Sequence, residues 1–191
     1  MYNEYDISIP SGITKEQLNE AVNKLKEGTV LSELGEYFIK AESMYDINAL
    51  ILMSIACLES GYGTSKLALS KHNLFGIDAR DSLRGTTAYG KAFKSYEECI
   101  YYTADRLGNQ YLKKDPNADW RYCGGNKDVW SVGQKWCSKS DWGDKVIDIA
   151  SRLVDVIEIE ETDTNDHTDY KEKYLKEKEI TDKIREILKE E

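Results

Sequence analysis

Residues 55–82 read IACLESGYGTSKLALSKHNLFGIDARDS and carry the features from which the fold of this 191-residue chain is inferred. The first six of these residues end a segment, 47–60, that is apolar on almost every side, which predicts a helix buried at the centre of the fold. Asp46 is the expected N-cap of this helix, and Gly61 ends it. Glu59 therefore lies at the C-terminal end of a buried helix.

A carboxyl group in this position has two influences that raise its pKa. Burial disfavours the anion, and the negative end of the helix dipole opposes it further. A glutamic acid that stays protonated near neutral pH is the group that glycoside hydrolysis needs to protonate the leaving oxygen. An ordinary exposed glutamate is the commoner occupant of a helix end, so the surrounding motifs must decide between the two interpretations of Glu59.

Three short motifs follow one another around this glutamate. They consist of Ala56, Glu59 and Ser60, then Gly63, Ser65 and Ala68, and then Asn73, Phe75, Gly76 and Ile77. In this order they resemble the signature of glycoside hydrolase family 73, the peptidoglycan N-acetylglucosaminidases of bacterial autolysins, flagellar-assembly hydrolases and phage lysins. The resemblance continues through FKSYEECIYYTADRL and WCSKSDWGDKV and spans roughly residues 41–153.

This resemblance implies a lysozyme-like fold and an enzyme with Glu59 as general acid. Its substrate would be the glycan strand of peptidoglycan, cleaved at the β-1,4 bond between N-acetylglucosamine and N-acetylmuramic acid. Sequences of the family often have a second carboxylate after the third motif, where Asp81 is the matching position and Asp78 the competitor. Such a carboxylate would orient a water or stabilise the oxocarbenium-like transition state. A third option needs no second carboxylate, because the N-acetyl group of the substrate can act as nucleophile.

The chain departs from the family pattern at one aromatic position. Where the family usually has an active-site tyrosine, this sequence has Trp136, whose indole can stack on a sugar or donate its N–H but has no hydroxyl. Tyr122 is the nearby alternative source of a hydroxyl. We expect Tyr62, just past the acid, to contact the substrate, and Asn73 to bond either a sugar or the backbone. Other aromatic residues that could line a carbohydrate cleft or fill the core are Phe75, Trp120, Trp130 and Trp142.

The rest of the pattern is mostly helical. Helical spacing or capping boxes mark the segments 14–28, 31–38, 95–108, 129–136 and 146–157, with Gly108 as an expected helix end. From Gly85 to Phe93, threonine and aromatic residues broken by Gly90 predict a short hairpin. The sequence therefore predicts an α+β domain that is mostly helical and has one small β-hairpin.

The acidic charge is concentrated at the C-terminal end. The net charge is −9, and residues 158–191 contain 13 acidic and 7 basic residues. We expect a catalytic domain at 1–157, followed at 158–191 by an acidic linker and a charged helical tail that could self-associate or join a larger assembly. The nearly balanced body has no dense lysine and arginine cluster, which argues against nucleic acid as a partner.

Several other features narrow the class of protein. No apolar run is long enough to span a membrane, and no histidine or cysteine spacing suggests a metal or cofactor. Cys57 and Cys99 are expected to be buried thiols, whereas a bridge between Cys123 and Cys137 is left open. The N-terminus lacks a secretory signal pattern, so a wall hydrolase of this kind would be a phage lysin or tail component, or a fragment of a longer exported protein.

Three other functions compete with this interpretation. Lytic transglycosylases and muramidases use related folds, but the former typically continue to Gly-Leu-Met-Gln, where this chain has Asn73-Leu-Phe-Gly-Ile. A cysteine hydrolase would need Cys57 or Cys99 to be activated by His72. A non-enzymatic binding or oligomerisation module would leave Glu59 without a chemical role.

Overall fold

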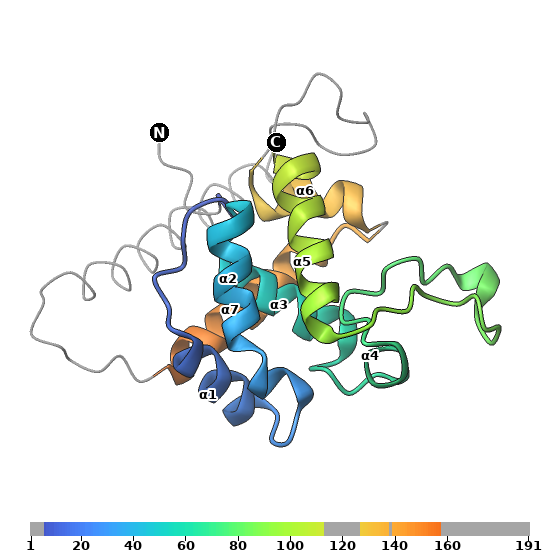
Figure 1. Ribbon diagram of the computed structural model, residues 1–191. Helices are drawn as coiled ribbons and strands as arrows, with labels where there is room; N and C mark the ends of the chain where they lie inside the picture. Colours follow the sequence, from blue (N-terminus) through green and yellow to red (C-terminus); the bar gives the residue numbers. More distant parts are fainter. Residues whose placement is uncertain (1–5, 113–126, 138, 158–191) are drawn as a thin grey trace, which may run out of the picture. The chain divides into compact units, whose positions relative to one another are not determined.

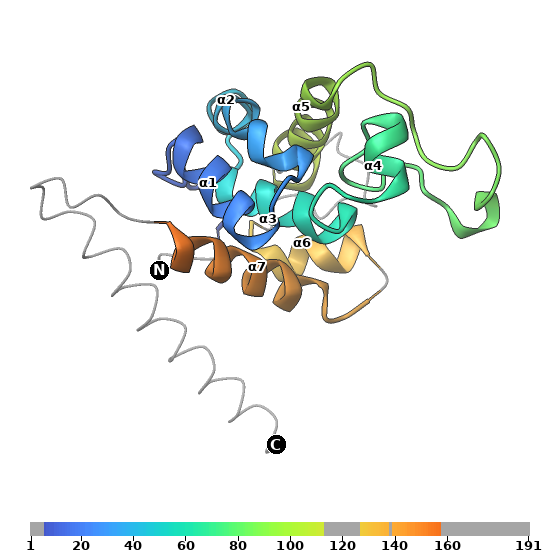
Figure 2. The same cartoon turned by 90° about the horizontal axis from the view of Figure 1, so that it is seen from below.

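Helix α3 (Ala49–Ser60) forms the centre of the fold (Figure 1 and Figure 2). The computed structural model describes residues 6–112, 127–137 and 139–157. Nine of the 12 residues of α3 are buried, as an almost wholly apolar segment requires. The prediction of a buried central helix that carries Glu59 near its C-terminal end is therefore confirmed.

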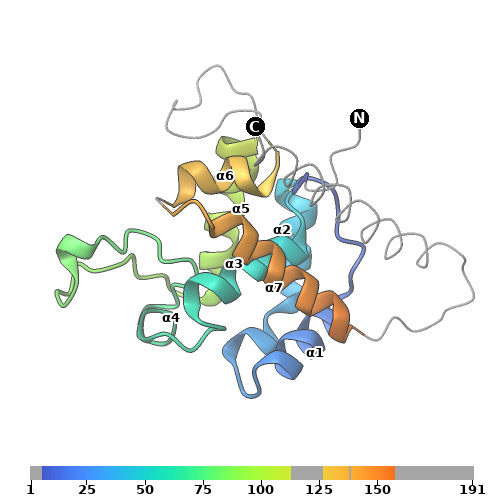
Figure 3. The ribbon, with the colours of Figure 1, turned by 180° about the vertical axis from the view of Figure 1, so that it is seen from behind.

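The remaining elements of the described residues are also helical. They are α1 (Lys15–Leu25), α2 (Gly35–Tyr45), α4 (Lys66–Lys71), α5 (Tyr96–Arg106), α6 (Val129–Trp136) and α7 (Trp142–Val156), with 3-10 turns at Val30–Glu33 and Asp81–Leu83 and a π-helical segment at Leu107–Leu112. Helix α7 lies over α3 in the view of Figure 3 and also packs against α1 and α6. Helix α2 packs against α1, α3 and α5. The central helix is thereby covered by neighbours on several sides.

The start of α3 differs from the prediction. Its N-cap is Asn48, whose side chain accepts a hydrogen bond from the backbone N–H of Ile51 at 3.0 Å. Asp46, the predicted cap, instead ends α2 in the left-handed conformation, with φ of 51°. Because only Ile47 separates Asp46 from Asn48, one polar residue ends α2 and another begins α3.

Other helix ends agree with the sequence in part. The capping box of α1 is present, and Gly61 ends α3 in the left-handed conformation. Gly108 is not the expected helix end, because the chain continues through it as a π-helical segment. A Cβ at this position would lie 2.0 Å from the carbonyl oxygen of Tyr45, so the glycine permits a close approach to α2. Its function is packing rather than the left-handed turn that we predicted.

The predicted β-hairpin at 85–93 is wrong. In the described residues this segment consists of turns and bends, and the β-pairing of the described chain is an isolated bridge between Asp6 and Asp128. The physical reason lies at the end of α4, where the Lys71 ammonium donates to the carbonyls of Thr87 at 2.7 Å and of Tyr89 and Gly90 at 3.0 Å each. These carbonyls therefore bind a cation instead of a partner strand.

Some of the sequence predictions lie outside the described residues. These are Trp120, Tyr122, Cys123 and the linker and tail at 158–191. The described residues belong to one compact unit. In this part of the chain, none of the helices has the length and apolar character needed to cross a membrane.

We expect Lys71→Met to loosen the loop that follows the third motif. The change removes three hydrogen bonds from an ammonium group to backbone carbonyls, so the free energy of unfolding should fall by about 1–2 kcal/mol. Hydrogen exchange of residues 78–93 should accelerate, as measured by mass spectrometry. Lys66→Met, which replaces an exposed lysine at the start of the same helix, is the matched control. Equal exchange in the two variants would contradict the role given to Lys71.

Candidate active site

Glu59 is the penultimate residue of α3, and two tryptophans bind its carboxyl group. The indole N–H of Trp142 donates to Oε1 at 2.7 Å, and the indole N–H of Trp136 donates to the same oxygen at 3.3 Å. Trp142 begins α7 and Trp136 ends α6, so three helices meet at this carboxyl group. The contact joins residues that are 77 and 83 positions apart in the chain.

The surroundings of Glu59 raise the pKa of its carboxyl group above the ordinary glutamate value. Burial is the largest cause, and the hydrogen bonds from Trp142 and Trp136 act in the opposite direction because they stabilise the anion. The side chain is nevertheless partly accessible. A carboxyl group that favours its protonated form and can still be reached from outside is suited to donating a proton.

The corner between α6 and α7 fixes the two indoles. Trp142 is only 4% exposed, and its ring packs against Gly133 so closely that a Cβ there would lie 2.8 Å from Cε3 of the indole. The rings of Trp136 and Trp142 lie side by side, with centroids 6.2 Å apart and planes inclined by 33°. The ring of Tyr111 packs on Trp136 at a centroid distance of 5.7 Å. Both indole donors are therefore held by packing.

The second motif shapes the chain directly after the acid. Gly63 donates its N–H to the hydroxyl of Ser60 at 2.6 Å, and Ser65 caps α4 by accepting from the N–H of Ala68 at 3.1 Å. Gly63 has a φ of 73°, and a Cβ there would lie 2.8 Å from side-chain atoms of Thr29 and Val30. These small and hydroxylated residues form a tight turn, so the motif has a structural function in this chain.

The third motif closes a loop against the acid. Asn73 is 1% exposed, and its amide donates to the carbonyls of Ile77 and Lys91 at 2.9 Å each and accepts from the N–H of Ile77 at 3.0 Å. Of the two roles predicted for Asn73, the structure shows the bond to the backbone, and contact with a sugar stays a prediction. The loop brings Gly76 to the acid, where a Cβ would lie 3.7 Å from Oε2 of Glu59. Phe75 is 2% exposed and belongs to the core.

Tyr62 occupies the turn directly after α3 in the left-handed conformation, with φ of 57°. The hydroxyl of Thr29 donates to its carbonyl. Its own hydroxyl is buried without a hydrogen-bond partner in the structure, and burial raises its pKa. Arg152 and Asp148, two charged groups that act on the pKa of this hydroxyl, belong to α7.

The two aspartates predicted as a second carboxylate lie on the same loop. Asp81 begins the 3-10 turn Asp81–Leu83. Asp78 is exposed and left-handed, with φ of 58°, and its carbonyl accepts from the N–H of Gly90 at 3.3 Å. The structure describes the backbone of Asp81 but not its side chain, so its relation to Glu59 stays a prediction.

The thiols fit no catalytic arrangement. Cys57 and Cys99 are buried, and burial raises the pKa of each thiol to about 12. The Nδ1–H of His72 donates to the carbonyl of Phe93 at 3.0 Å, so this ring nitrogen already has a partner. A thiol with so high a pKa does not form the thiolate that a cysteine hydrolase requires. The cysteine hydrolase is therefore contradicted.

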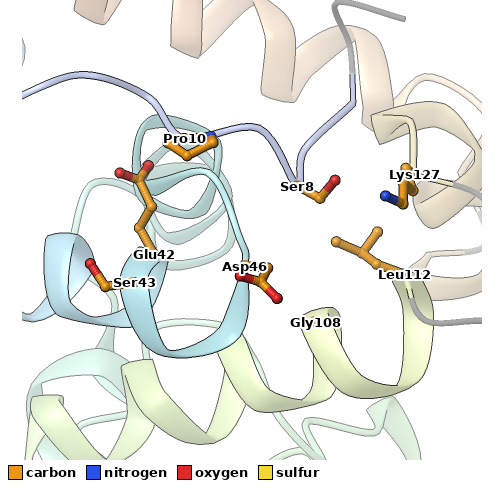
Figure 4. A pocket seen from close by; sticks show the side chains of 8 residues that line it. All are labelled: Ser8, Pro10, Glu42, Ser43, Asp46, Gly108, Leu112 and Lys127. Atoms are coloured by element: carbon orange, nitrogen blue, oxygen red, sulfur yellow. The ribbon is translucent and has the colours of Figure 1, made fainter.

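A cavity of about 420 Å³ lies apart from this group of residues (Figure 4). Its lining residues are Ser8, Pro10, Glu42, Ser43, Asp46, Gly108, Leu112 and Lys127. The carboxylate of Glu42 accepts the backbone N–H groups of Ser11 at 2.6 Å and Ala49 at 2.8 Å, and it thereby joins the N-terminal segment to the start of α3. Trp136, Trp142 and Gly76, which lie at the Glu59 carboxyl in the described part of the chain, are not among the residues that line this cavity.

Trp142 is the functional residue that sequence reasoning missed. Its ring was counted among aromatic residues that could line a cleft or fill the core, with no link to the acid. The signal that could have found it is its place in the WCSKSDWGDKV segment, six residues after Trp136 and at the start of a helix. The sequence alone does not show that two residues on different helices share one acceptor.

A buried helix with a glutamic acid near its C-terminal end, whose carboxyl pKa is raised by burial, is the arrangement expected of a glycoside hydrolase that uses a general acid. The family model described as mannosyl-glycoprotein endo-beta-N-acetylglucosaminidase, or Glucosaminidase, matches residues 35–154. The chain belongs to this Glucosaminidase family, and the predicted resemblance is confirmed.

Two relatives illustrate the range of the family. A Streptococcus pneumoniae protein named as an endo-beta-N-acetylglucosaminidase is 29% identical over 151 residues, which are 78% of this chain and 21% of that protein. A Staphylococcus aureus bifunctional autolysin is 35% identical over 127 residues, which are 56% of this chain and 10% of the autolysin. The chain thus spans about a fifth and a tenth of the lengths of these relatives.

A solved structure confirms the fold. It is the crystal structure of a catalytic mutant, glutamate to alanine, of S. aureus autolysin E in complex with the disaccharide NAG-NAM. Its TM-score is 0.57 at 22% sequence identity, and the match covers 78% of this chain and 70% of the autolysin chain. The mostly helical, lysozyme-like fold is therefore shown.

We expect the raised pKa of Glu59 to appear in the pH dependence of stability. Below the pKa of an unfolded glutamate, about 4.3, both states are protonated and burial of the neutral group costs little. As pH rises through the higher folded pKa, the unfolded state ionises more readily and the wild-type free energy of unfolding falls. Glu59→Gln should remove this fall, as measured by urea unfolding across a pH series.

Glu36→Gln is the matched control for this measurement. Lys40 bonds Glu36 and holds the pKa of this exposed carboxyl below its usual range. Its replacement should leave the fall of stability with rising pH in place. A wild-type protein whose stability shows the same pH dependence as Glu59→Gln would contradict a raised pKa at Glu59.

Proposed function

We propose that this chain hydrolyses the β-1,4 bond between N-acetylglucosamine and N-acetylmuramic acid in bacterial peptidoglycan. The observation that carries the proposal is the Glu59 carboxyl, whose pKa burial raises while the residue stays partly accessible. Membership of the Glucosaminidase family supports it, as does the disaccharide bound by the structurally similar autolysin E. Cell wall peptidoglycan would then be the substrate, as the names of the autolysin relatives suggest.

In this proposal Glu59 gives its proton to the glycosidic oxygen as the bond to the anomeric carbon breaks. The positive charge that develops on the sugar ring is met either by a water that Asp81 orients or by the N-acetyl group of the substrate. Tyr62, Tyr122 and Trp136 are proposed to contact the sugar. The buried position of the Tyr62 hydroxyl limits that residue to contact through the accessible part of its ring.

The proposal also covers how this domain assembles and how it reaches peptidoglycan. The charged helical pattern of residues 171–191 supports self-association or attachment to a larger assembly. A phage lysin, a phage tail component or a fragment of a longer exported wall hydrolase would each bring the domain to peptidoglycan.

The reaction product identifies the bond that is cleaved. Purified peptidoglycan is digested, the new ends are reduced with borohydride, and the terminal sugars are identified by mass spectrometry. Reduced N-acetylglucosamine is the expected result. Reduced N-acetylmuramic acid would point to a muramidase and anhydro-N-acetylmuramic acid to a lytic transglycosylase. The absence of new ends across several wall types would support the non-enzymatic module.

We expect Glu59→Gln to lower turnover by about 10²–10⁴-fold, the usual contribution of general acid catalysis. Glutamine keeps the size of the side chain and can still accept from the two indoles, so the fold should persist, as checked by circular dichroism. Release of reducing ends from peptidoglycan measures the rate. Unchanged turnover would show that another residue supplies the proton.

A comparison of two aspartates tests the second carboxylate. Asp81→Asn should lower turnover more than Asp78→Asn, because Asp81 matches the position where the family often has its second carboxylate. Both substitutions are nearly isosteric and lie on the same loop, so each is the other's control. The reverse order would transfer the role to Asp78, and no effect from either would favour the N-acetyl group as nucleophile.

A further inference from the structure

The two indole N–H groups at the acid converge on one of its two oxygens. Trp142 donates to Oε1 of Glu59 at 2.7 Å and Trp136 donates to the same atom at 3.3 Å. The other oxygen, Oε2, lies on the side of Gly76, where even a Cβ would come no closer than 3.7 Å. Among the described residues the carboxyl group is therefore asymmetric, with donors at one oxygen and a residue without a side chain beside the other.

We propose that Trp136 and Trp142 are positioning residues that place the acidic proton of Glu59 on Oε2, so that this oxygen protonates the substrate. In a neutral carboxyl group one oxygen carries the proton and the other is a pure acceptor. Two N–H donors at Oε1 favour the form in which Oε1 is the carbonyl oxygen and Oε2 the hydroxyl. The inference rests on the proposed function of Glu59 and specifies the atom that acts.

The same arrangement favours the reaction as it proceeds. The proton leaves Oε2 for the glycosidic oxygen, the electron pair of the O–H bond remains on the carboxylate, and the C–O bond breaks with its pair on the leaving oxygen. The new bond to the anomeric carbon comes from a water, whose released proton passes to the second carboxylate, or from the N-acetyl oxygen of the substrate. Hydrogen bonds to Oε1 strengthen as the carboxylate gains charge, so the indoles stabilise the transition state more than the ground state.

Tryptophan is suited to this task for two reasons. The indole N–H donates only, so neither residue can accept the proton in place of the substrate. Both rings are also held before the substrate arrives, Trp142 by its packing on Gly133 and Trp136 by the ring of Tyr111. Donors that are already in place need no reorganisation during the reaction.

The chain offers a matched control for the substitution that tests this. Trp130 also lies on α6, and its indole N–H donates to Oδ1 of Asp144 on α7 at 2.9 Å. Trp130→Phe therefore removes an indole bond to a carboxylate between the same two helices without touching Glu59. Trp142→Phe removes the bond at the acid.

The first readout is the infrared C=O stretch of protonated Glu59, isolated as the difference between each protein and its Glu59→Gln counterpart. A carbonyl that accepts hydrogen bonds vibrates at a lower frequency than one that does not. Trp142→Phe should therefore shift the band to higher frequency, Trp136→Phe should shift it less because its bond is longer, and Trp130→Phe should leave it unchanged.

The second readout is the pH dependence of peptidoglycan hydrolysis. Trp142→Phe should lower kcat by about tenfold to a hundredfold, the rate equivalent of losing a hydrogen bond to a charged group, with KM little changed. The indole bonds favour the anion, so their loss should move the high-pH fall in kcat/KM to still higher pH. In Trp130→Phe the high-pH fall in kcat/KM should occur at the same pH as in the wild type.

A Trp142→Phe protein with the infrared band and pH limb of Trp130→Phe would overturn the proposal. If Trp142→Phe does not fold, a benzothienyl analogue at position 142, which keeps the ring shape but lacks the N–H, replaces it with the same expected shifts. The infrared result does not require activity. If the wild type is inactive but Trp142→Phe still shifts the band, the result contradicts the proposed function alone. If the wild type is active and Trp142→Phe does not shift the band, the result contradicts the role of the indoles alone.

Discussion

The hydrogen-bonded carboxyl group of Glu59 is the point on which the organisation of this domain depends. Burial at the end of α3 favours its protonated form, and the two indoles at Oε1 limit how far its pKa rises. This balance requires a helix apolar enough to lie at the centre of the fold. It also requires two further helices, α6 and α7, that bring hydrogen-bond donors to the C-terminal end of that helix. The packing at Gly133 serves that second requirement, since a larger residue there would displace the Trp142 ring.

Tryptophan side chains supply the described hydrogen bonds to Glu59 in this chain. A phenol can donate, accept and titrate, whereas an indole N–H can only donate. With the indoles of Trp136 and Trp142 at Oε1, Glu59 has two donors that do not exchange protons with it. The two indoles thus give Glu59 described partners whose charge is constant with pH.

Much of the fold was accessible from the sequence because its signals are local. The apolar run of α3, the capping box at Thr14 and the left-handed Gly61 each depend on neighbours within a few positions. The errors arose where distant residues decide. Lys71 binds the carbonyls that a hairpin would have paired, and the carbonyl of Tyr45 explains Gly108 better than a helix end does.

The candidate site likewise contains residues that a local motif predicts and residues that only the fold brings together. The motif around Glu59 is contiguous, so the sequence alone is enough to propose Glu59 as the acid. The partnership with Trp142 joins positions 83 residues apart and depends on the angle at which α6 meets α7, which no local pattern encodes. Asn73 shows the converse, because its amide has the chemistry to bond a sugar, and only the fold reveals that three backbone groups of the loop already occupy it.

The protonation of Glu59 can be measured directly in the folded protein. The experiment is a carbon-13 NMR titration of protein labelled at the glutamate carboxyl carbons, with the Glu59 signal assigned by its loss in Glu59→Gln. We expect this signal to titrate above the ordinary glutamate value of about 4.3 and above the other glutamates of the chain. A midpoint at or below that value would show that the carboxyl is ionised when a general acid must be protonated, and it would contradict the proposed chemistry of the site.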